Sequence, residues 1–193
     1  MRIKCCGITR PADARYAEVC GADAIGVVVF SPTSKRSVTP ERAREIFDTV
    51  GPFTTTVAVS HTILPEDLEQ ILALHPDAIQ ISHPFVFREK PKVRVIQVIG
   101  RTDPLPTDCD AIIVDESHGS GKNFDLSHAR EAVQRSKLPV ILAGGLTPEN
   151  VADAIRQVHP YAVDVASGIE TAPGIKDHKK IAAFIAAVRK GVP

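Results

Sequence analysis

The sequence predicts a (β/α)8 barrel, the TIM-barrel fold, formed by residues 1–193 as a single domain. Short apolar runs rich in β-branched residues alternate with helical patterns along the chain, and eight such runs can be counted. Because alternating strands and helices form a parallel sheet, eight repeats are typical of a closed barrel. A doubly wound open sheet, which needs fewer strands, is the alternative. The expected strands are residues 2–6, 24–30, 54–60, 78–82, 93–99, 110–115, 139–143 and 161–166.

Helical patterns follow six of the eight expected strands. The pattern over 39–50 begins with Thr39 as N-cap and Pro40 at the first helical position. The connections 83–92 and 100–109 have about the minimum length of a crossover, and the second contains two prolines. We therefore expect helices 4 and 5 of the barrel to be shortened or irregular. The helical patterns cover residues 11–22, 39–50, 64–75, 125–136, 147–158 and 177–190.

The composition excludes several classes of partner. Lys+Arg and Asp+Glu balance at 23 each, so nothing indicates nucleic acid or a membrane surface. The four cysteines show neither CxxC spacing nor a Cys/His cluster at zinc-ligand spacing, so no metal site is predicted. No apolar run approaches the roughly 20 residues that span a bilayer, and no signal-peptide pattern is present. We expect reduced thiols and a cytoplasmic protein.

In a barrel of this kind, working residues lie at the carboxyl ends of the strands and in the loops that follow. Those positions include one thiol, two carboxylates, an arginine and two glycine-bearing loops. His83 is the one histidine expected near this rim, whereas the others, including His61, fall in loops or on helix surfaces. The candidate residues are Cys6, Arg36, His83, Asp115, Gly144, Gly145, Asp164, Ser167 and Gly168.

Two glycine-bearing loops are candidates for binding a phosphate. Gly144 and Gly145 follow the seventh strand, and Ser167 and Gly168 follow the eighth. Loops 7 and 8 are the usual phosphate site of barrel enzymes, and a short helix that starts after Gly168 would add its dipole. The alternative is that the glycines are ordinary turn residues or caps.

Cys6 is the candidate nucleophile or base among the cysteines. If its side chain points into the barrel, strand alternation points Lys4 inward one layer deeper and Cys5 outward. An interior Lys4 would lower the cost of a Cys6 thiolate, and a thiolate can act as a base or nucleophile. The alternative is an inert thiol that packs as a small hydrophobic group, which is how we interpret Cys5, Cys20 and Cys109.

Asp115 and Asp164 are expected to face the barrel interior. Asp115 shares strand parity with Ala111 and Ile113, and Asp164 lies within the apolar run "AVDVA". Buried carboxylates tend to keep their proton near neutral pH unless a cation is near, which suits a general acid. The alternative for both is a structural carboxylate that pairs with Lys4 or caps a loop. The segment "HGSGKNFD", over 118–125, lacks the spacing of a phosphate P-loop and is expected to be a mobile loop that folds over a ligand.

Several blocks of the chain, taken in order, closely resemble the phosphoribosylanthranilate isomerase family of tryptophan biosynthesis. The resemblance implies a (β/α)8 barrel that binds a phosphosugar and converts N-(5-phosphoribosyl)anthranilate, an aminoaldose, to the aminoketose by an Amadori rearrangement. It also implies no cofactor, because the substrate nitrogen acts as the electron sink. The blocks that carry it are "KCCGIT", "GADAIGVVVF", "SKRSVTPE", "GSGKNFD", "ILAGGLTPENV", "VDVASGIE" and "PGIKD".

The resemblance also implies roles for individual residues. Cys6 would be the general base that removes the proton from sugar C2, and Asp115 the general acid that protonates the ring oxygen. Arg36 would hold the anthranilate end, and Asp164 would line the substrate site. The phosphate would fall to Gly144, Gly145, Ser167 and Gly168. Assembly as a monomer or a homodimer is left open.

Two departures from the family pattern concern the ends of strands three and four. Where the family often has Gln-Leu-His-Gly, the chain reads "QISH", so Ser82 takes the histidine position and His83 follows it. Where it often has Phe-Val-Asn, the chain reads "VSHT". Two alternative functions follow: another phosphosugar isomerase that accepts a related aminoaldose, and an inactive barrel that binds phosphosugars. The presence of both Cys6 and Asp115 argues against the second.

Overall fold

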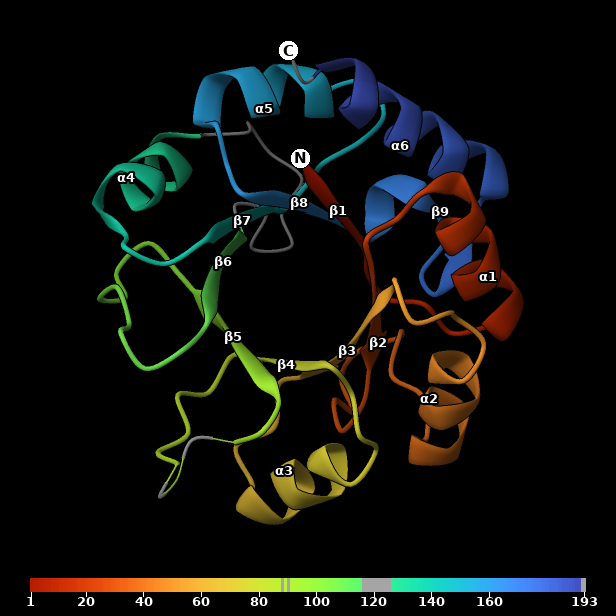
Figure 1. The fold of residues 1–193 in the computed structure, drawn as a ribbon, viewed down its shortest axis with the longest axis vertical. Helices are drawn as coiled ribbons and strands as arrows, with labels where there is room; N and C mark the ends of the chain where they lie inside the picture. Colours follow the sequence, from red (N-terminus) through yellow and green to blue (C-terminus); the bar gives the residue numbers. More distant parts are fainter. Residues whose placement is uncertain (88, 90, 116–125, 192–193) are drawn as a thin grey trace.

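A computed structural model of the chain describes residues 1–87, 89, 91–115 and 126–191. Eight parallel strands form a closed barrel in which each strand pairs with the next and the last pairs with the first (Figure 1). Each strand lies within its predicted range, so the barrel prediction is confirmed and the open sheet is wrong. The strands are β1 (Arg2–Cys5), β2 (Ala24–Val28), β3 (Thr55–Ser60), β4 (Ala78–Ile81), β5 (Arg94–Ile99), β6 (Ala111–Asp115), β7 (Val140–Ala143) and β8 (Ala162–Val165).

Six helices of the described chain surround the barrel: α1 (Pro11–Cys20), α2 (Pro40–Phe47), α3 (Pro65–Leu72), α4 (Ser127–Arg135), α5 (Val151–Val158) and α6 (His178–Gly191) (Figure 1). The predicted cap of α2 is confirmed, because the Thr39 side chain accepts a hydrogen bond from the Arg42 N–H at 3.3 Å. Helix α5 begins at Val151, later than its pattern predicts. The Thr147 N–H donates to the Asn150 side chain at 2.8 Å, which closes a turn ahead of the helix.

The arc of the barrel between β4 and β6 has loops where the rest has helices (Figure 1). No helix is assigned to the described residues of 82–93 or 100–110, which confirms the prediction of shortened or irregular helices 4 and 5. Prolines interrupt both connections, and a proline removes a backbone donor from any helix interior. Side chains of these loops, including Phe85, Phe87 and Leu105, line a cavity of about 670 Å³ beside β5.

Two separate hydrophobic clusters pack on opposite sides of the barrel wall. The larger fills the space between strands and helices and includes Cys5, which is fully buried. The smaller fills the barrel interior and includes Cys6 and Ile113, with Ala111 packed against it. This division confirms the strand parity that the sequence predicts for β1 and β6.

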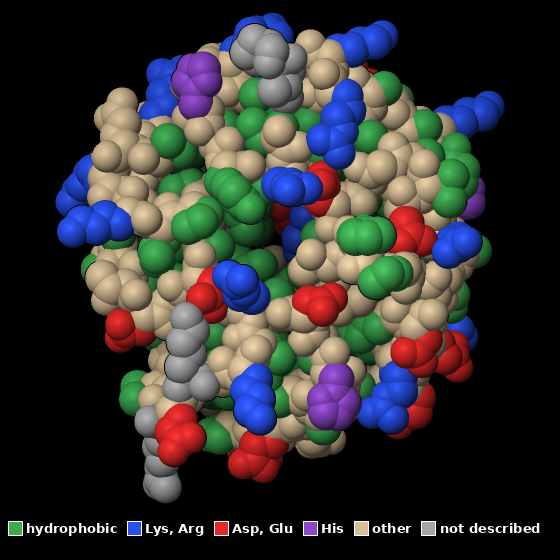
Figure 2. Space-filling view, in the orientation of Figure 1, with side chains coloured by type: hydrophobic (Ala, Val, Ile, Leu, Met, Phe, Trp, Pro, Cys, Tyr) green, Lys and Arg blue, Asp and Glu red, His purple; other side chains and the backbone are tan. Residues whose placement is uncertain are grey.

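The surface carries charges of both signs. Figure 2 shows acidic and basic side chains both at the perimeter of one face and around its central hollow, with hydrophobic side chains between them. This mixture agrees with the balance of 23 basic and 23 acidic residues in the chain. Among the helices of the described residues, none combines the length and the apolar character that crossing a bilayer requires.

Candidate functional site

A buried ion pair joins the first and last strands of the barrel. Lys4 and Asp164 are partners in the register of β1 and β8, and Lys4 Nζ lies 2.8 Å from Asp164 Oδ1. Their side chains are only 5% and 8% exposed. Burial is the largest single effect and disfavours the Lys4 cation, but the charges and hydrogen bonds of Asp164 and Cys6 together outweigh burial and raise the pKa of Lys4. The structural alternative for Asp164, pairing with Lys4, is therefore observed.

Cys6 lies next to this pair at the end of β1, and its N–H donates to the Val165 carbonyl at 2.8 Å. Gly26 of β2 leaves the room that the thiol occupies. A Cβ there would lie 2.8 Å from Cys6 Sγ and 3.0 Å from Lys4 Nζ, closer than packed atoms approach. With any larger residue at position 26, the Cys6 thiol or the Lys4 ammonium would have to move.

The net effect of these surroundings on Cys6 differs from the expectation. Burial raises the pKa of the Cys6 thiol most, Asp164 raises it further, and Lys4 lowers it. Lys4 thus favours the thiolate as predicted, but the other two effects are larger and the net shift is upward. Burial also raises the pKa of Cys5 to about 12, in keeping with its place in the outer core.

Asp115 is the last residue of β6, and its side chain is exposed. Ala111 and Ile113 line the barrel interior as expected, but the expected burial of Asp115 is wrong. The physical reason is position: β6 ends at this residue, so the strand carries its carboxylate out to the mouth of the barrel.

Loops 7 and 8 pack against each other backbone to backbone. A Cβ at Gly168 would lie 1.9 Å from the Leu146 carbonyl oxygen, so only glycine fits there. Gly144 and Gly145 have φ values of +89° and +61°, which turns the chain sharply after β7. The N–H groups of Gly144, Gly145, Ser167 and Gly168 donate to no other residue within the described chain. These donors are available to an anion.

The segment after Gly168 is a hairpin rather than the start of a helix. Ser167–Ile169 form a 3₁₀ turn, followed by the antiparallel strands β9 (Glu170–Ala172) and β10 (Ile175–Lys176). The expectation of a helix after Gly168 is therefore wrong. Gly174, which joins the two strands, has a φ of +83° that favours the hairpin turn.

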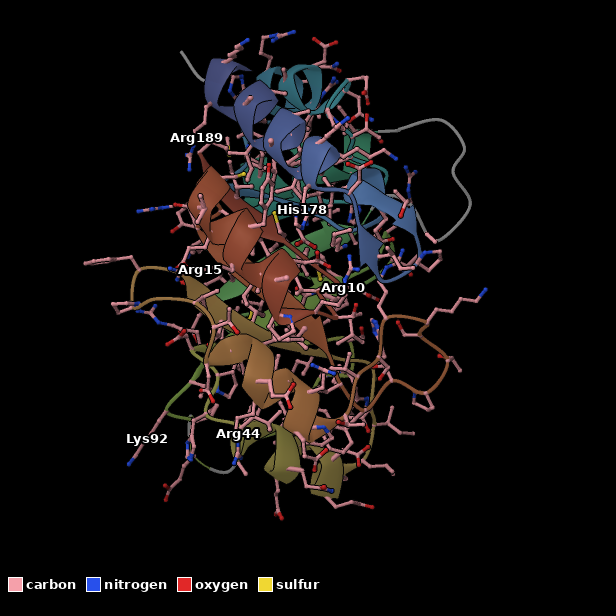
Figure 3. All side chains as sticks on the ribbon, turned by 90° about the vertical axis from the view of Figure 1, so that its right-hand side faces the viewer. Arg10, Arg15, Arg44, Lys92, His178 and Arg189 are labelled. Carbon is pink, nitrogen blue, oxygen red and sulfur yellow. The ribbon has the colours of Figure 1, made fainter. Side chains whose placement is uncertain are left out.

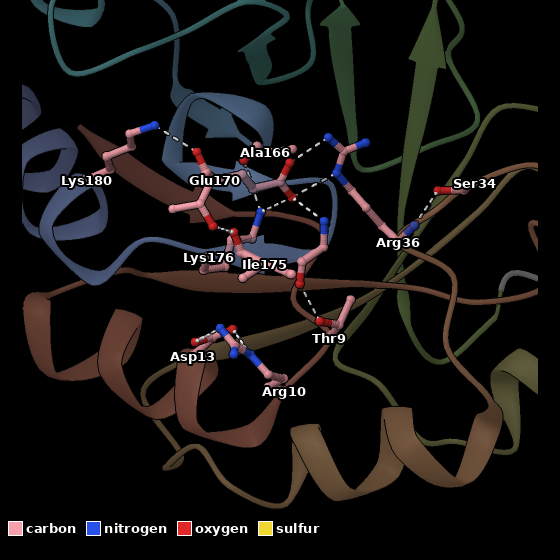
Figure 4. Close-up of polar contacts among 12 residues, drawn as sticks. Thr9, Arg10, Asp13, Ser34, Arg36, Ala166, Glu170, Ile175, Lys176 and Lys180 are labelled. Carbon is pink, nitrogen blue, oxygen red and sulfur yellow. Dashed lines mark hydrogen bonds and ion pairs between the residues drawn. The ribbon is translucent and has the colours of Figure 1, made fainter.

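Glu170 lies at the centre of a polar network that the sequence interpretation missed (Figure 4). Its carboxylate accepts hydrogen bonds from Arg36 Nε at 2.9 Å and Nη2 at 2.7 Å, and from Lys176 Nζ at 2.9 Å. Burial opposes ionisation of Glu170, but the hydrogen bonds from Arg36 and Lys176 outweigh it and lower the pKa of Glu170. Glu170 belongs to the block "VDVASGIE" and Lys176 to the block "PGIKD". The charged residue in each block was the sequence signal that could have indicated this network.

Arg36 reaches Glu170 by lying across Gly7 of the first loop. A Cβ at Gly7 would lie 2.5 Å from Arg36 Cδ, and Gly7 has a φ of +70°. The hydrogen bond to Glu170 is the largest cause of the raised pKa of Arg36. Arg36 therefore enters the site as a fixed cation.

His83 and its neighbours lie at the ends of β3 and β4. The His83 side chain is exposed and its ring meets Phe85 edge-on, with centroids 4.7 Å apart. His61, for which no role was predicted, lies with its Nδ1 2.7 Å from Ser82 Oγ. The segments "VSHT" and "QISH", which both depart from the family pattern, thus contact each other through His61 and Ser82.

Contacts outside the barrel tie the β9–β10 hairpin to the loop after β1 and to α6. The Thr9 hydroxyl donates to the Gly174 carbonyl at 2.5 Å, and Lys180 Nζ donates to the Glu170 carbonyl at 2.8 Å (Figure 4). In a side view, His178 lies between Arg189 and Arg10 (Figure 3). Both His178 and Arg10 contact Asp13, whose side chain is buried.

Two further predictions concern the segment 118–125 and metal binding. The segment 118–125, expected to cover a ligand, lies outside the described residues. Within residues 1–87, 89, 91–115 and 126–191, no group of three or more His, Cys, Asp or Glu side chains is placed to hold a metal ion.

Comparison with known proteins gives consistent matches over nearly the whole chain. A family model described as N-(5'phosphoribosyl)anthranilate (PRA) isomerase matches residues 3–187. An N-(5'-phosphoribosyl)anthranilate isomerase of Methanoregula boonei is 66% identical over 190 residues, which cover 98% of this chain and 97% of the relative.

Two solved structures are also similar. One is a phosphoribosyl anthranilate isomerase in complex with reduced 1-(o-carboxyphenylamino)-1-deoxyribulose 5-phosphate; it is 34% identical, with a TM-score of 0.81 and coverage of 98% of this chain and 99% of the other. The second comprises monomers generated from the dimeric enzyme of Thermotoga maritima. It is 32% identical, with a TM-score of 0.78 and coverage of 98% of each chain.

Proposed function

The chain belongs to the N-(5'-phosphoribosyl)anthranilate isomerase family, and we propose that Cys6 is the general base and Asp115 the general acid of its reaction. The enzyme is an isomerase of tryptophan biosynthesis that converts the aminoaldose to the aminoketose. The observation that carries the proposal is the placement of both side chains at the carboxyl ends of barrel strands, the end at which loops 7 and 8 also lie.

The Amadori rearrangement needs one group that donates a proton and one that accepts a proton. Asp115 protonates the furanose ring oxygen, the C1–O bond breaks, and the anthranilate nitrogen stabilises the resulting cation at C1. Cys6 then removes the proton from C2, and the electron pair of the C2–H bond forms an enolamine with C1. Protonation at C1 and loss of the O2 proton yield the ketose. The two groups lie in different surroundings, with the Cys6 thiol buried inside the barrel and the Asp115 carboxylate exposed at its mouth. Their positions at the ends of barrel strands, rather than these surroundings, support the division of roles.

The substrate has two anionic groups, a phosphate and an aromatic carboxylate, and the site offers hydrogen-bond donors in loops 7 and 8 and a cation at Arg36. The phosphate is bound by the unpaired N–H groups of Gly144, Gly145, Ser167 and Gly168. The aromatic carboxylate is bound by Arg36, and the sugar lies beside Asp164, with His83 near the aromatic ring. The product analogue that a 34% identical relative binds carries both a carboxylate and a phosphate, which supports this arrangement.

Conversion of freshly prepared N-(5'-phosphoribosyl)anthranilate, followed by loss of anthranilate fluorescence, tests the assignment. Cys6→Ser should lower turnover by at least about two orders of magnitude, the usual contribution of a general base, while the fold is retained. Asp115→Asn should remove acid catalysis yet still bind the reduced product analogue. Near-normal turnover in either variant would remove that residue from the mechanism.

Two further predictions remain open. Assembly as a monomer or a homodimer is a prediction, and the relative described as dimeric supports the second form. The cytoplasmic location is likewise a prediction, which localisation of the tagged chain in its own cells would check.

A further inference from the structure

Glu170 is a buried carboxylate that satisfies several donors at once. Its side chain is 4% exposed and contacts Arg36 and Lys176, while the Gly174 N–H donates to Oε1 at 3.1 Å. Lys176 is fully buried, and its ammonium also donates to the Ala166 carbonyl at 3.0 Å. The donors to the Glu170 carboxylate come from two segments, the loop after β2 and the β9–β10 hairpin.

Burial of such a cluster is costly, which makes a purely stabilising role a weak explanation. Removing two cations and a carboxylate from water costs several kcal/mol per ion in general, and well-packed apolar residues often replace buried ion pairs without loss. Conformational specificity is the better-supported use of a buried ionic group. The geometry of Arg36 indicates which conformation Glu170 specifies.

The bidentate contact fixes the plane of the Arg36 guanidinium. Nε and Nη2 both bind Glu170, so rotation about the end of the side chain is blocked. Nη1 has no hydrogen bond to any residue that the structure describes, and the side chain is 27% exposed. The aliphatic part of the Arg36 side chain packs against Gly7. The edge of the guanidinium that carries Nη1 is therefore the edge at which a planar carboxylate can bind.

We propose that Glu170 is a positioning residue that holds the Arg36 fork in the orientation that recognises the aromatic carboxylate of the substrate. This inference rests on the proposed role of Arg36. Glu170 follows Ser167 and Gly168 in the same loop, so one segment provides phosphate donors and also orients the carboxylate-binding cation. Lys176 neutralises Glu170, which leaves the charge of Arg36 available to the ligand.

A comparison of two substrates separates positioning from general support of the fold. N-(5'-phosphoribosyl)anthranilate carries the aromatic carboxylate, and N-(5'-phosphoribosyl)aniline lacks it; both form when ribose 5-phosphate condenses with the aromatic amine. The measured quantity is the ratio of kcat/KM for the two substrates. Because only folded enzyme turns over either substrate, a partly unfolded variant lowers both values and leaves the ratio unchanged.

Glu170→Gln keeps the size of the side chain but removes its charge. The variant should lower the ratio about 10- to 100-fold, the range for a lost charged hydrogen bond, through a raised KM for the anthranilate substrate. Arg36→Met should lower the ratio at least as far, and the double variant should lower it no further than Arg36→Met alone. Glu45→Gln, which removes an exposed carboxylate paired with Arg42 on α2, is the matched control and should leave the ratio unchanged.

The outcomes distinguish the two claims. If Arg36→Met lowers the ratio and Glu170→Gln does not, the positioning role of Glu170 is overturned and the role of Arg36 stands. If Arg36→Met itself leaves the ratio unchanged, Arg36 does not bind the carboxylate and both claims fail. Equal losses for both substrates in Glu170→Gln would show that Glu170 only supports the fold.

Discussion

Cys6 is the residue on which the proposed mechanism depends, and neighbours of opposite charge act on its thiol. Strand alternation predicts that Lys4 and Cys6 share one face of the first strand and that Cys5 lies on the other. The structure shows that the shared face is the barrel interior. The net direction of the thiol's pKa could not be predicted, because it depends on how burial and Asp164 compare with Lys4. The same limit applies to Glu170, whose partners come from loops far away in the sequence.

Asp164→Asn should make the Cys6 thiol easier to ionise. Asp164 is one of the groups that raise the pKa of Cys6, and Lys4, which lowers it, remains in the variant. Alkylation of Cys6 by iodoacetamide should therefore be faster in Asp164→Asn than in the wild type at pH 7 to 8. Peptide mass spectrometry assigns the reaction to Cys6, and Asp164→Glu, which keeps the charge, is the control. A slower reaction in Asp164→Asn would show that the carboxylate does not oppose the thiolate.

Gly26→Ala should disturb the interior pair and the thiol together. The added methyl group would lie 2.8 Å from Cys6 Sγ and 3.0 Å from Lys4 Nζ, and the ion pair with Asp164 limits how far Lys4 can move. We expect a loss of about 1–3 kcal/mol in unfolding free energy, as for other overpacked interiors, together with lower kcat. Urea denaturation and the fluorescence assay measure both. Gly51→Ala, next to an exposed loop, is the control, and unchanged kcat in Gly26→Ala would contradict the account.

Loop 8 shows which secondary-structure elements can be predicted from the sequence and which cannot. The strands and most helices follow from periodicity and capping residues, and the missing helices follow from short proline-containing connections. The hairpin of β9 and β10 could not be predicted, because its strands are short and its stability comes from contacts with Thr9, Arg36 and Lys180. The contact of Gly168 with Leu146 likewise depends on two loops that only the closed barrel brings together.

Gly168→Ala should separate loops 7 and 8 and weaken phosphate binding. The Cβ would lie 1.9 Å from the Leu146 carbonyl oxygen, so the backbone must move and the N–H groups of the two loops shift relative to each other. Inhibition by inorganic phosphate should weaken by about tenfold or more, the effect of losing one or two charge-assisted hydrogen bonds. Ser167→Ala, which removes only a hydroxyl group, should have a smaller effect. Equal inhibition constants in Gly168→Ala and the wild type would place the phosphate elsewhere.

The whole molecule is a barrel in which one pair of residues, Lys4 and Asp164, joins the first and last strands and also belongs to the candidate site. Counting eight apolar runs predicts the fold. The rule that working residues lie at the carboxyl ends of barrel strands selects most candidate residues. The sequence did not predict that Lys4 and Asp164 would pair across the β1–β8 seam, although it left that pairing open. It also gave no role to His61, since contact with Ser82 depends on the spatial proximity of β3 and β4.

Glu170 should contribute to the pH dependence of stability. Its pKa is lowered in the folded state, so its contribution is present above the ordinary value of about 4.3 and is lost as pH falls through the folded value. Urea denaturation should therefore show a larger difference between the wild type and Glu170→Gln at pH 7 than at pH 3.5. A difference that stays constant or grows on acidification would contradict the direction of the shift.

The division of labour between Cys6 and Asp115 is tested most directly by a hydrogen isotope effect. The substrate is prepared with deuterium at sugar C2, and kcat/KM is compared with that of the unlabelled substrate. In Cys6→Ser, removal of the C2 proton becomes the slow step, so a large primary isotope effect is predicted. In Asp115→Asn, ring opening becomes the slow step, so the ratio should approach one. A ratio near one in Cys6→Ser would show that another group removes the C2 proton.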